Sequence, residues 1–215
     1  MEYFSEFQNF GMNLLTISFF TTLVFATLTS VALIKQMGRI KKRESGKSVS
    51  FIFYSYFGWS ALAAVIYALD KRSLALAVNG LFVGIFALGV VRYLLKYKDI
   101  SVREKVIGLI ISPIIIPLVF FIKEKDTIFV IAGTIVLSSL FHQVYEVWHN
   151  KDPGSIHPAQ SIISITASLF WIVYVFLFNY YYSKLLWPLL VFNPVALILW
   201  IIFLVLYFKY KRKEH

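Results

Sequence analysis

The chain has 215 residues, of which 59 % are hydrophobic, 18 % aromatic and only 15 % charged, and its formal net charge is +10. A soluble domain carries about 25 % charged residues, and no water-soluble fold of this size has enough interior to hide so much apolar surface. We therefore exclude a soluble protein and expect lipid to surround most of the chain. The basic residues lie in short runs between apolar segments. This pattern fits a membrane surface and excludes nucleic acid as a partner.

Three further features narrow the class of protein. The sequence has no cysteine, which excludes disulfides and thiolate metal ligands. It also lacks clustered carboxylates and the signature motifs of hydrolases, zinc peptidases and P-loop enzymes, so we expect no enzyme activity, no cofactor and no metal. The first ten residues contain Glu2 and Glu6 but no Lys or Arg, unlike a secretory signal peptide. The first apolar stretch is therefore expected to be a retained span.

Seven apolar segments are long enough to cross a bilayer. A spanning helix needs roughly 20 residues, because it rises about 1.5 Å per residue across a core of about 30 Å. The fourth segment contains Pro113 and Pro117, which a helix in lipid tolerates when neighbouring groups satisfy the freed carbonyls. The sequence thus predicts an all-α membrane protein with seven transmembrane helices, near residues 12–34, 50–69, 74–95, 106–122, 127–148, 159–179 and 185–208.

The distribution of Lys and Arg predicts the orientation of these spans. Sixteen basic residues fall on one side, namely Lys35, Arg39, Lys41, Lys42, Arg43, Lys47, Arg92, Lys96, Lys98, Arg103, Lys105, Lys151, Lys209, Lys211, Arg212 and Lys213. Five fall on the other, namely Lys71, Arg72, Lys123, Lys125 and Lys184. Because cytoplasmic loops carry the basic excess, we predict a cytoplasmic C-terminus and an N-terminus outside, with the plasma membrane as the expected location. The basic first loop is also expected to contact anionic lipids.

The sequence contains an internal repeat, visible as weak but collinear matches. At a separation of 107 residues Gln36 matches Gln143, Ser48 matches Ser155 and Tyr67 matches Tyr174, and at 114 residues Asn79 matches Asn193 and Tyr93 matches Tyr207. We therefore expect a first three-helix repeat at 1–98, a linker helix at 99–125, and a second three-helix repeat with a basic tail at 126–215. Three spans are an odd number, so the linker span makes the two repeats parallel, related by an axis along the membrane normal.

Residues at equivalent points of the repeats resemble those of the SWEET, SemiSWEET and PQ-loop transporters. The pattern is a glutamine ending the first helix, a basic loop, a Lys-Ser-x-Ser start to the second helix and an asparagine in the third, here Gln36, Lys47, Ser48, Ser50 and Asn79, with Trp171 and Tyr174 in the second half. The resemblance covers nearly the whole chain. It implies the three-plus-one-plus-three fold already known for that family, and sugar transport. The chain departs from the family where Lys35 and His142 replace proline before the glutamines, where Phe51 is the counterpart of Pro158, and where Ala64 is the counterpart of Trp171.

Asn79 and Asn193 are the sharpest candidates for a substrate site. A polar side chain within a span normally faces the bundle or a cavity. Each amide offers two donors and an acceptor oxygen, which can bind the hydroxyls of a neutral solute without selecting for charge. The alternative is a structural contact between helices.

Aromatic and hydroxyl side chains within the spans complete the predicted substrate site. Trp171 can stack on a sugar-like ring, or else pack against lipid or a helix. Tyr67 and Tyr174 are assigned to the same site. Ser60, Ser164, Thr166 and Ser168 can contribute hydroxyls to the site, but we expect most of them to bond to their own helices.

Other residues are assigned to gating and to proton coupling. Gln36, Gln143 and Pro158 correspond to the positions that form the gate of the resembling family. His142 and Glu146 stand four residues apart on one helical face, and histidine titrates near neutrality, so this pair can couple proton movement to transport. The alternative, which we favour, is a partly hydrated pair at the membrane surface. Facilitated diffusion is then the simpler mechanism.

These features predict a uniporter of a small neutral solute, most simply a sugar, that alternates access around a central site between the repeats. The alternatives are a seven-helix receptor or sensor of the same fold, or a transporter of amino acids or a vitamin nucleoside. A retinal-type photoreceptor is excluded, because the last span has no lysine between Lys184 and Lys209 to form a Schiff base. The expected partners are the solute and membrane lipids. A monomer can suffice, since one chain contains both repeats, and a homo-oligomer is the alternative.

Overall fold

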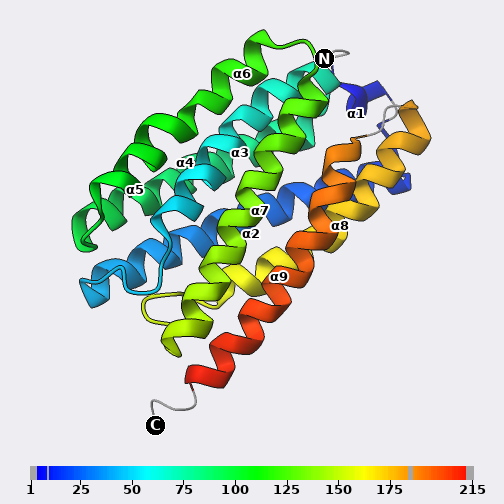
Figure 1. Ribbon diagram of the computed structural model, residues 1–215. Coiled ribbons are helices and arrows are strands. Elements are labelled where there is room, and N and C mark those ends of the chain that lie inside the picture. Colours follow the sequence, from blue (N-terminus) through cyan, green and yellow to red (C-terminus); the bar gives the residue numbers. More distant parts are fainter. Residues whose placement is uncertain (1–3, 9, 184–185, 212–215) are drawn as a thin grey trace.

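The computed structural model describes residues 4–8, 10–183 and 186–211, which form an elongated helical bundle (Figure 1). Within these ranges, seven helical segments are long and apolar enough to cross a membrane. Six are single α-helices, and the seventh is the interrupted linker at Val102–Phe121. The six are α2 (Leu14–Arg43), α3 (Phe51–Lys71), α4 (Leu74–Tyr97), α7 (Lys125–Asn150), α8 (Ala159–Tyr182) and α9 (Trp187–Lys211), and a short α1 (Ser5–Gln8) precedes them.

The helices agree closely with the predicted spans, with one clear extension. Helix α2 continues to Arg43, nine residues beyond the predicted limit at 34. Apart from Gly38, its last turns are built from Lys, Gln, Met, Arg and Ile, and most of these residue types have high helix propensity. The apolar part of the sequence ends where the lysines begin, but the helix continues through the polar residues that follow. The basic positions Lys184, Arg212 and Lys213 lie outside the described residues.

The linker is an interrupted helical rod where one straight helix was expected. It consists of α5 (Val102–Val106), a π-type turn (Ile107–Ile111), a 3₁₀ turn (Ser112–Ile114) and α6 (Ile115–Phe121). Pro113 has no amide hydrogen and its ring clashes with the carbonyl one turn earlier, so the backbone widens before it and tightens around it. The Ser112 hydroxyl donates to the Gly108 carbonyl at 2.6 Å, which satisfies one acceptor near the break. The rod packs against α3 and α7.

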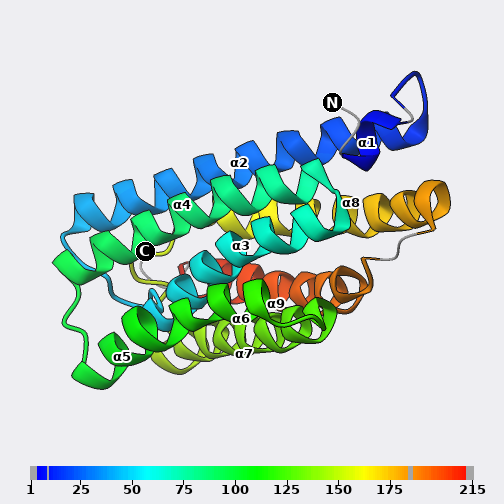
Figure 2. The same cartoon turned by 90° about the horizontal axis from the view of Figure 1, so that it is seen from above.

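The two repeats have the same internal arrangement. In each repeat the third helix packs between the other two: α4 contacts α2 and α3, and α9 contacts α7 and α8. The first helix of each repeat also contacts the second helix of the other, so that α2 packs against α8 and α7 against α3. Figures 1 and 2 show the resulting bundle, with the linker on its outside. The three-plus-one-plus-three fold is therefore confirmed.

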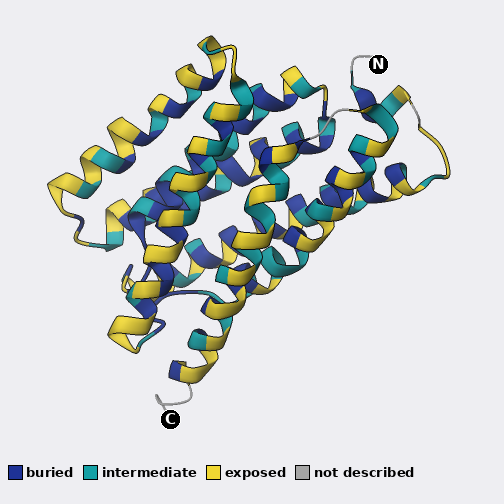
Figure 3. Cartoon of the chain, turned by 45° about the vertical axis from the view of Figure 1, so that its right-hand side comes forward, coloured by how far each residue is buried: buried dark blue, intermediate teal, exposed yellow. Residues whose placement is uncertain are grey.

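The outward faces of the helices are apolar and exposed, whereas the inward faces are buried (Figure 3). On α2 the exposed side chains recur every three or four residues and form one stripe, which is Ile17, Phe20, Val24, Leu28 and Val31. Such a stripe has no favourable partner in water, but it matches a hydrocarbon environment. The chain is thus an integral membrane protein.

The two termini lie at opposite ends of the bundle, as an odd number of spans requires (Figure 1). We call the end with loops 44–50 and 151–158 and the C-terminus of α9 the basic end. We call the end with α1, the turn at 72–73 and the start of α7 the N-terminal end. Which end faces the cytoplasm stays a prediction from the Lys and Arg count. Two buried clusters, one toward each end, hold the bundle together.

Candidate functional site

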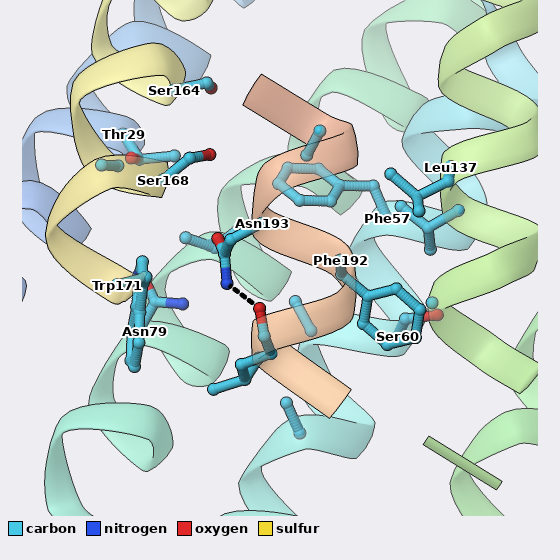
Figure 4. Close-up of a pocket in the computed structure, with 18 of the residues that line it drawn as sticks. Thr29, Phe57, Ser60, Asn79, Leu137, Ser164, Ser168, Trp171, Phe192 and Asn193 are labelled. Carbon is cyan, nitrogen blue, oxygen red and sulfur yellow. Dashed lines mark hydrogen bonds between the residues drawn. The ribbon is translucent and has the colours of Figure 1, made fainter. Parts of the chain in front are cut away.

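A cavity of about 230 Å³ lies between the two repeats (Figure 4). All six repeat helices contribute to its wall, and the linker contributes none of the described residues that line it. It reaches the first turns of α4 and α9 through Leu76 and Leu189, near the N-terminal end. Toward the basic end it stops at Phe57 and Trp200. We call this cavity the central pocket.

The lining of the central pocket repeats with the periodicity of the sequence. Five pairs of lining residues are separated by 107 positions and one pair by 114. The pairs are Thr29 with Val136, Phe57 with Ser164, Ser60 with Ala167, Ala61 with Ser168, Ala64 with Trp171, and Asn79 with Asn193. Equivalent positions of two parallel repeats can meet in one cavity only if the cavity surrounds the axis that relates them. The central pocket therefore lies on the pseudo-twofold axis.

Asn79 of α4 and Asn193 of α9 both line the central pocket, and Figure 4 shows their amides directed into it. The Asn193 amide donates one hydrogen bond to the Leu189 carbonyl of its own helix at 2.7 Å, which leaves its oxygen and its second N–H for a ligand. The Asn79 side chain makes no hydrogen bond with any described residue. Pro194 follows Asn193 without interrupting α9. The structure thus brings the two predicted amides together, and their role in binding stays a prediction.

The hydroxyl groups of the central pocket are free, although serines and threonines in membrane helices usually bond to their own backbone. Away from the pocket many hydroxyls follow that rule and donate to a carbonyl three or four residues earlier, whereas the buried Ser161 hydroxyl of α8 is an exception; those that follow it include Thr22, Ser30, Ser55, Thr134, Ser138 and Thr166. The four pocket hydroxyls have no such bond with the described part of the chain, and they belong to Thr29, Ser60, Ser164 and Ser168. The Ser60 oxygen is fully buried without a partner. The expectation that most of these serines bond to their own helices was wrong for Ser60, Ser164 and Ser168.

The rest of the pocket wall is apolar or aromatic and breaks the twofold symmetry. Trp171 of α8 is 7 % exposed and lines one side, whereas its counterpart Ala64 leaves the other side open. Trp200 closes the pocket toward the basic end. Among the described residues on this wall, none carries a formal charge. A solute in the pocket would therefore meet uncharged hydrogen-bonding groups and several aromatic rings.

Two buried glutamines hold the basic end together. Gln36 of α2 donates to the Ser155 carbonyl at 3.0 Å and accepts from the His157 N–H at 2.7 Å. Gln143 of α7 makes the same pair of bonds with Ser48 and Ser50. Each glutamine therefore binds the backbone of the loop that precedes the second helix of the opposite repeat. We call these two arrangements the glutamine clamps.

The two loops that the clamps hold also contact each other directly. The Ser155 N–H donates to the Lys47 carbonyl at 3.0 Å, and the Lys47 ammonium lies 2.5 Å from the Asp152 carboxylate. Burial acts to raise the pKa of Asp152, but hydrogen bonds from Lys47 and from the Gly154 N–H outweigh it and hold that pKa below its ordinary value. Gly154 has a φ of +51°, and a Cβ there would lie 2.4 Å from the Lys47 carbonyl oxygen. Only glycine allows the loops to cross this closely.

The two predicted substrate tyrosines lie at the N-terminal end, outside the pocket wall. The Tyr67 hydroxyl of α3 donates to Asp126 of α7 at 2.6 Å, and Tyr174 of α8 donates to Glu6 of α1 at 2.6 Å. Both rings are fully buried. A buried phenol needs an acceptor, and a carboxylate at the start of the opposite repeat supplies it in both cases. Neither tyrosine lines the central pocket, and their assignment to the substrate site stays a prediction.

Charged groups add to the contacts at this end. Lys71 pairs with Asp126 at 2.9 Å, and Lys125 pairs with Asp70 at 2.8 Å, so the end of α3 and the start of α7 exchange two ion pairs. Glu6 also accepts from the Ser73 hydroxyl at 3.0 Å. At this end the equivalent tyrosines Tyr67 and Tyr174 both contact the opposite repeat, whereas the two ion pairs join only α3 and α7.

The remaining predicted residues lie away from the central pocket. Pro158 is the N-cap residue of α8, next to the loop held by Gln36. His142 and Glu146 form the expected pair, with 3.6 Å between the His142 Nδ1 and a Glu146 oxygen. The His142 side chain is 57 % exposed, on the surface of α7 near the basic end. This position fits the surface pair that we favoured over proton coupling.

Some residues of the site were missed from the sequence. Thr29 was missed because its counterpart is apolar, although Thr22, Thr29 and Gln36 recur every seven residues and are all buried on one face of α2. That spacing of two helical turns was an available signal. Glu6 and Asp126 were missed because Glu6 lies outside the apolar segments and Asp126 lies at the edge of one. Charged residues are common at such positions and do not by themselves indicate a site.

No protein-family model and no curated protein sequence matches the chain. Among solved structures, the fold is similar to that in "The 3.7 A resolution structure of a eukaryotic SWEET transporter", with a TM-score of 0.56. The similarity covers 93 % of this chain and 100 % of that chain, at 20 % sequence identity. This finding supports the fold class that the sequence predicted.

Proposed function

We propose that this chain is a facilitative transporter of a small neutral solute rich in hydroxyl groups, most simply a sugar, which binds in the central pocket. The observation that carries this proposal is the set of polar groups on its wall with unused hydrogen-bonding capacity: the amide of Asn79, the oxygen and second N–H of Asn193, and the four pocket hydroxyls. An unpaired polar group in a buried site costs about 1–3 kcal/mol. A solute with several hydroxyls can satisfy these groups together, and Trp171 offers an apolar face to its ring.

The absence of charge among the described lining residues favours a neutral substrate. An amino acid brings an ammonium and a carboxylate, and burying either without a counter-charge costs several kcal/mol. The amino-acid alternative therefore has no supporting feature in this pocket. A sugar needs only donors and acceptors.

The contacts at the two ends suggest how access alternates. The glutamine clamps join the repeats at the basic end, and Tyr67 and Tyr174 bond to carboxylates of the opposite repeat at the N-terminal end. We infer that transport releases one set at a time as the repeats move about the pseudo-twofold axis. His142 and Glu146 lie off this path, so we expect uniport without proton coupling. The similar solved structure is that of a transporter.

Counterflow into proteoliposomes tests the proposal. The purified chain should exchange one of a panel of radiolabelled neutral sugars, and a protonophore should leave the rate unchanged. Asn79→Ala and Asn193→Ala should each weaken binding by roughly three- to tenfold, because one hydrogen bond to a neutral ligand contributes about 0.5–1.5 kcal/mol. Asn179→Ala is the matched control, since Asn179 lies in α8 outside the pocket wall.

Three outcomes would count against the proposal in different ways. Unchanged counterflow in both asparagine variants removes the pocket as the site. Saturable binding of a sugar without any counterflow points to the receptor alternative. Uptake that stops when a protonophore is added contradicts uniport and supports proton coupling through His142 and Glu146.

A further inference from the structure

A second cavity lies at the basic end on the outside of the first repeat. Its volume is about 270 Å³, and it is lined by Lys41 of α2 together with Arg92, Tyr93, Lys96 and Tyr97 of α4. It shares no residue with the central pocket. Three of its five lining side chains are therefore cationic and the other two are tyrosines. We call it the basic cavity.

The basic cavity sits at the depth of lipid headgroups. The apolar part of α2 ends near residue 34, and Lys41 lies seven residues further along the helix, about 10 Å at 1.5 Å per residue. On α4 the last buried apolar residues are Val90, Val91 and Leu94, and the lining residues lie between and just beyond them. Headgroups extend about 5–8 Å beyond each side of the hydrocarbon core. The Lys41 backbone thus lies just beyond this layer, and its long side chain, which in a helix points back toward the N-terminus, can reach the phosphates in it.

The cationic side chains of the basic cavity have no acidic partners. None of Lys41, Arg92 and Lys96 forms an ion pair among the described residues, whereas Lys47, Lys71 and Lys125 at other sites do. Arg92 and Lys96 are one helical turn apart on α4, and so are the two tyrosines. The Lys96 ammonium lies 5.1 Å from the centre of the Tyr97 ring, and the rings of Tyr93 and Tyr97 stack with centroids 6.3 Å apart.

We propose that the basic cavity binds an anionic phospholipid through a phosphomonoester headgroup. A phosphomonoester carries a charge of about −1.5 to −2 near neutrality, so it matches converging cations better than a singly charged phosphodiester does. The Arg92 guanidinium can bind two phosphate oxygens at once. Lys41 and Lys96 complete the charge, and the tyrosine hydroxyls donate further hydrogen bonds. The lipid would bridge the ends of α2 and α4, the first and third helices of one repeat.

Native mass spectrometry of the purified chain with phosphatidic acid, phosphatidylglycerol or phosphatidylcholine tests this site. The chain should retain one phosphatidic acid at least tenfold more tightly than phosphatidylglycerol, which has one phosphodiester charge. The triple variant K41Q/R92Q/K96Q should lose that preference. The control K42Q/R103Q/K105Q removes the same charge from exposed positions outside the cavity and should keep the preference within twofold.

A replacement variant and two alternative outcomes allow the proposed lipid site to be contradicted. If the triple variant does not fold, Arg92→Lys replaces it, because it preserves charge but removes the two-point contact, and selectivity should fall severalfold. Equal losses in the triple variant and its control would show diffuse surface attraction and overturn the site. Displacement of the lipid by equimolar glycerol phosphate would overturn the lipid assignment, because a soluble phosphate would then be the ligand. Sugar counterflow is a separate readout, so failure of this site and of the transport proposal are distinguishable.

Discussion

Replacing Gln36 with methionine should open the central pocket toward the basic end. Methionine has a similar length and no hydrogen-bonding amide, so it fills the space but cannot form the clamp. The Gln36 side chain is fully buried, and its two bonds satisfy the Ser155 carbonyl and the His157 N–H. Ser155 is 1 % exposed, whereas His157 is partly exposed and can recruit water. The variant therefore leaves the Ser155 carbonyl without a hydrogen bond, and the His157 N–H can be satisfied only in part, by water.

The size of the effect follows from these two groups. A buried unpaired group costs about 1–3 kcal/mol, so the closed basic end loses roughly 2 kcal/mol. A shift of this size changes a two-state population by roughly 30-fold. The pseudo-twofold axis predicts a similar effect for Gln143→Met, because Gln143 makes the equivalent bonds in the other repeat.

Thiol accessibility measures this opening directly. The chain has no cysteine, so Ser168→Cys places a single thiol on the wall of the central pocket. A membrane-impermeant thiol reagent added from the side of the basic end should react about 30-fold faster in the Gln36→Met background. Gln8→Met is the matched control, since it makes the same change at the opposite end of the molecule. A variant that unfolds at a lower temperature but reacts at the unchanged rate would refute the clamp as a gate.

Two further predictions concern pH and helix packing. Burial lowers the pKa of His157 below its ordinary value of 6.5, and the charges of Arg39, Lys35 and Lys211 lower it further. As the pH falls through about 6.5, the unfolded chain therefore takes up a proton at this histidine before the folded chain does. The free energy of unfolding decreases as a result. The thermal midpoint should decline from pH 7.5 to 5.5, and less so in His157→Gln; an equal decline in both would contradict the assignment. Gly80→Ala should destabilise the bundle by about 1–3 kcal/mol, because the new Cβ would lie 2.5 Å from the Ala61 carbonyl oxygen. Gly38→Ala, where a Cβ meets nothing within 4 Å, is its control, and an equal midpoint in both variants would contradict the packing argument.

Much of the fold could be predicted because lipid imposes simple rules on sequence. Each span must be about 20 residues of apolar sequence, so the seven segments are visible without any knowledge of packing. The linker was the exception, since Pro113 changed one predicted helix into short pieces. Its presence was clear from the sequence, but the way the backbone responds depends on what Gly108 and Ser112 contact.

The candidate site was predictable only where polarity contrasted with its surroundings. Asn79 and Asn193 were conspicuous in apolar spans, and both line the central pocket. Tyr67 and Tyr174 were equally conspicuous but lie elsewhere, because the sequence says that a tyrosine is in a span and not which acceptor its hydroxyl will find. Glu6 and Asp126 provide those acceptors from distant parts of the chain.

The sequence by itself determined the membrane environment, the number of spans and the two-repeat plan. Each of these three properties depends only on the types of residue and on their spacing along the chain. Only the tertiary structure decided which hydroxyls stay free, which residues close the two ends, and where the basic cavity forms. These properties depend on how helices from different parts of the chain meet. A serine on a pocket wall and a serine against its own backbone are the same letter, and only the neighbouring helix distinguishes them.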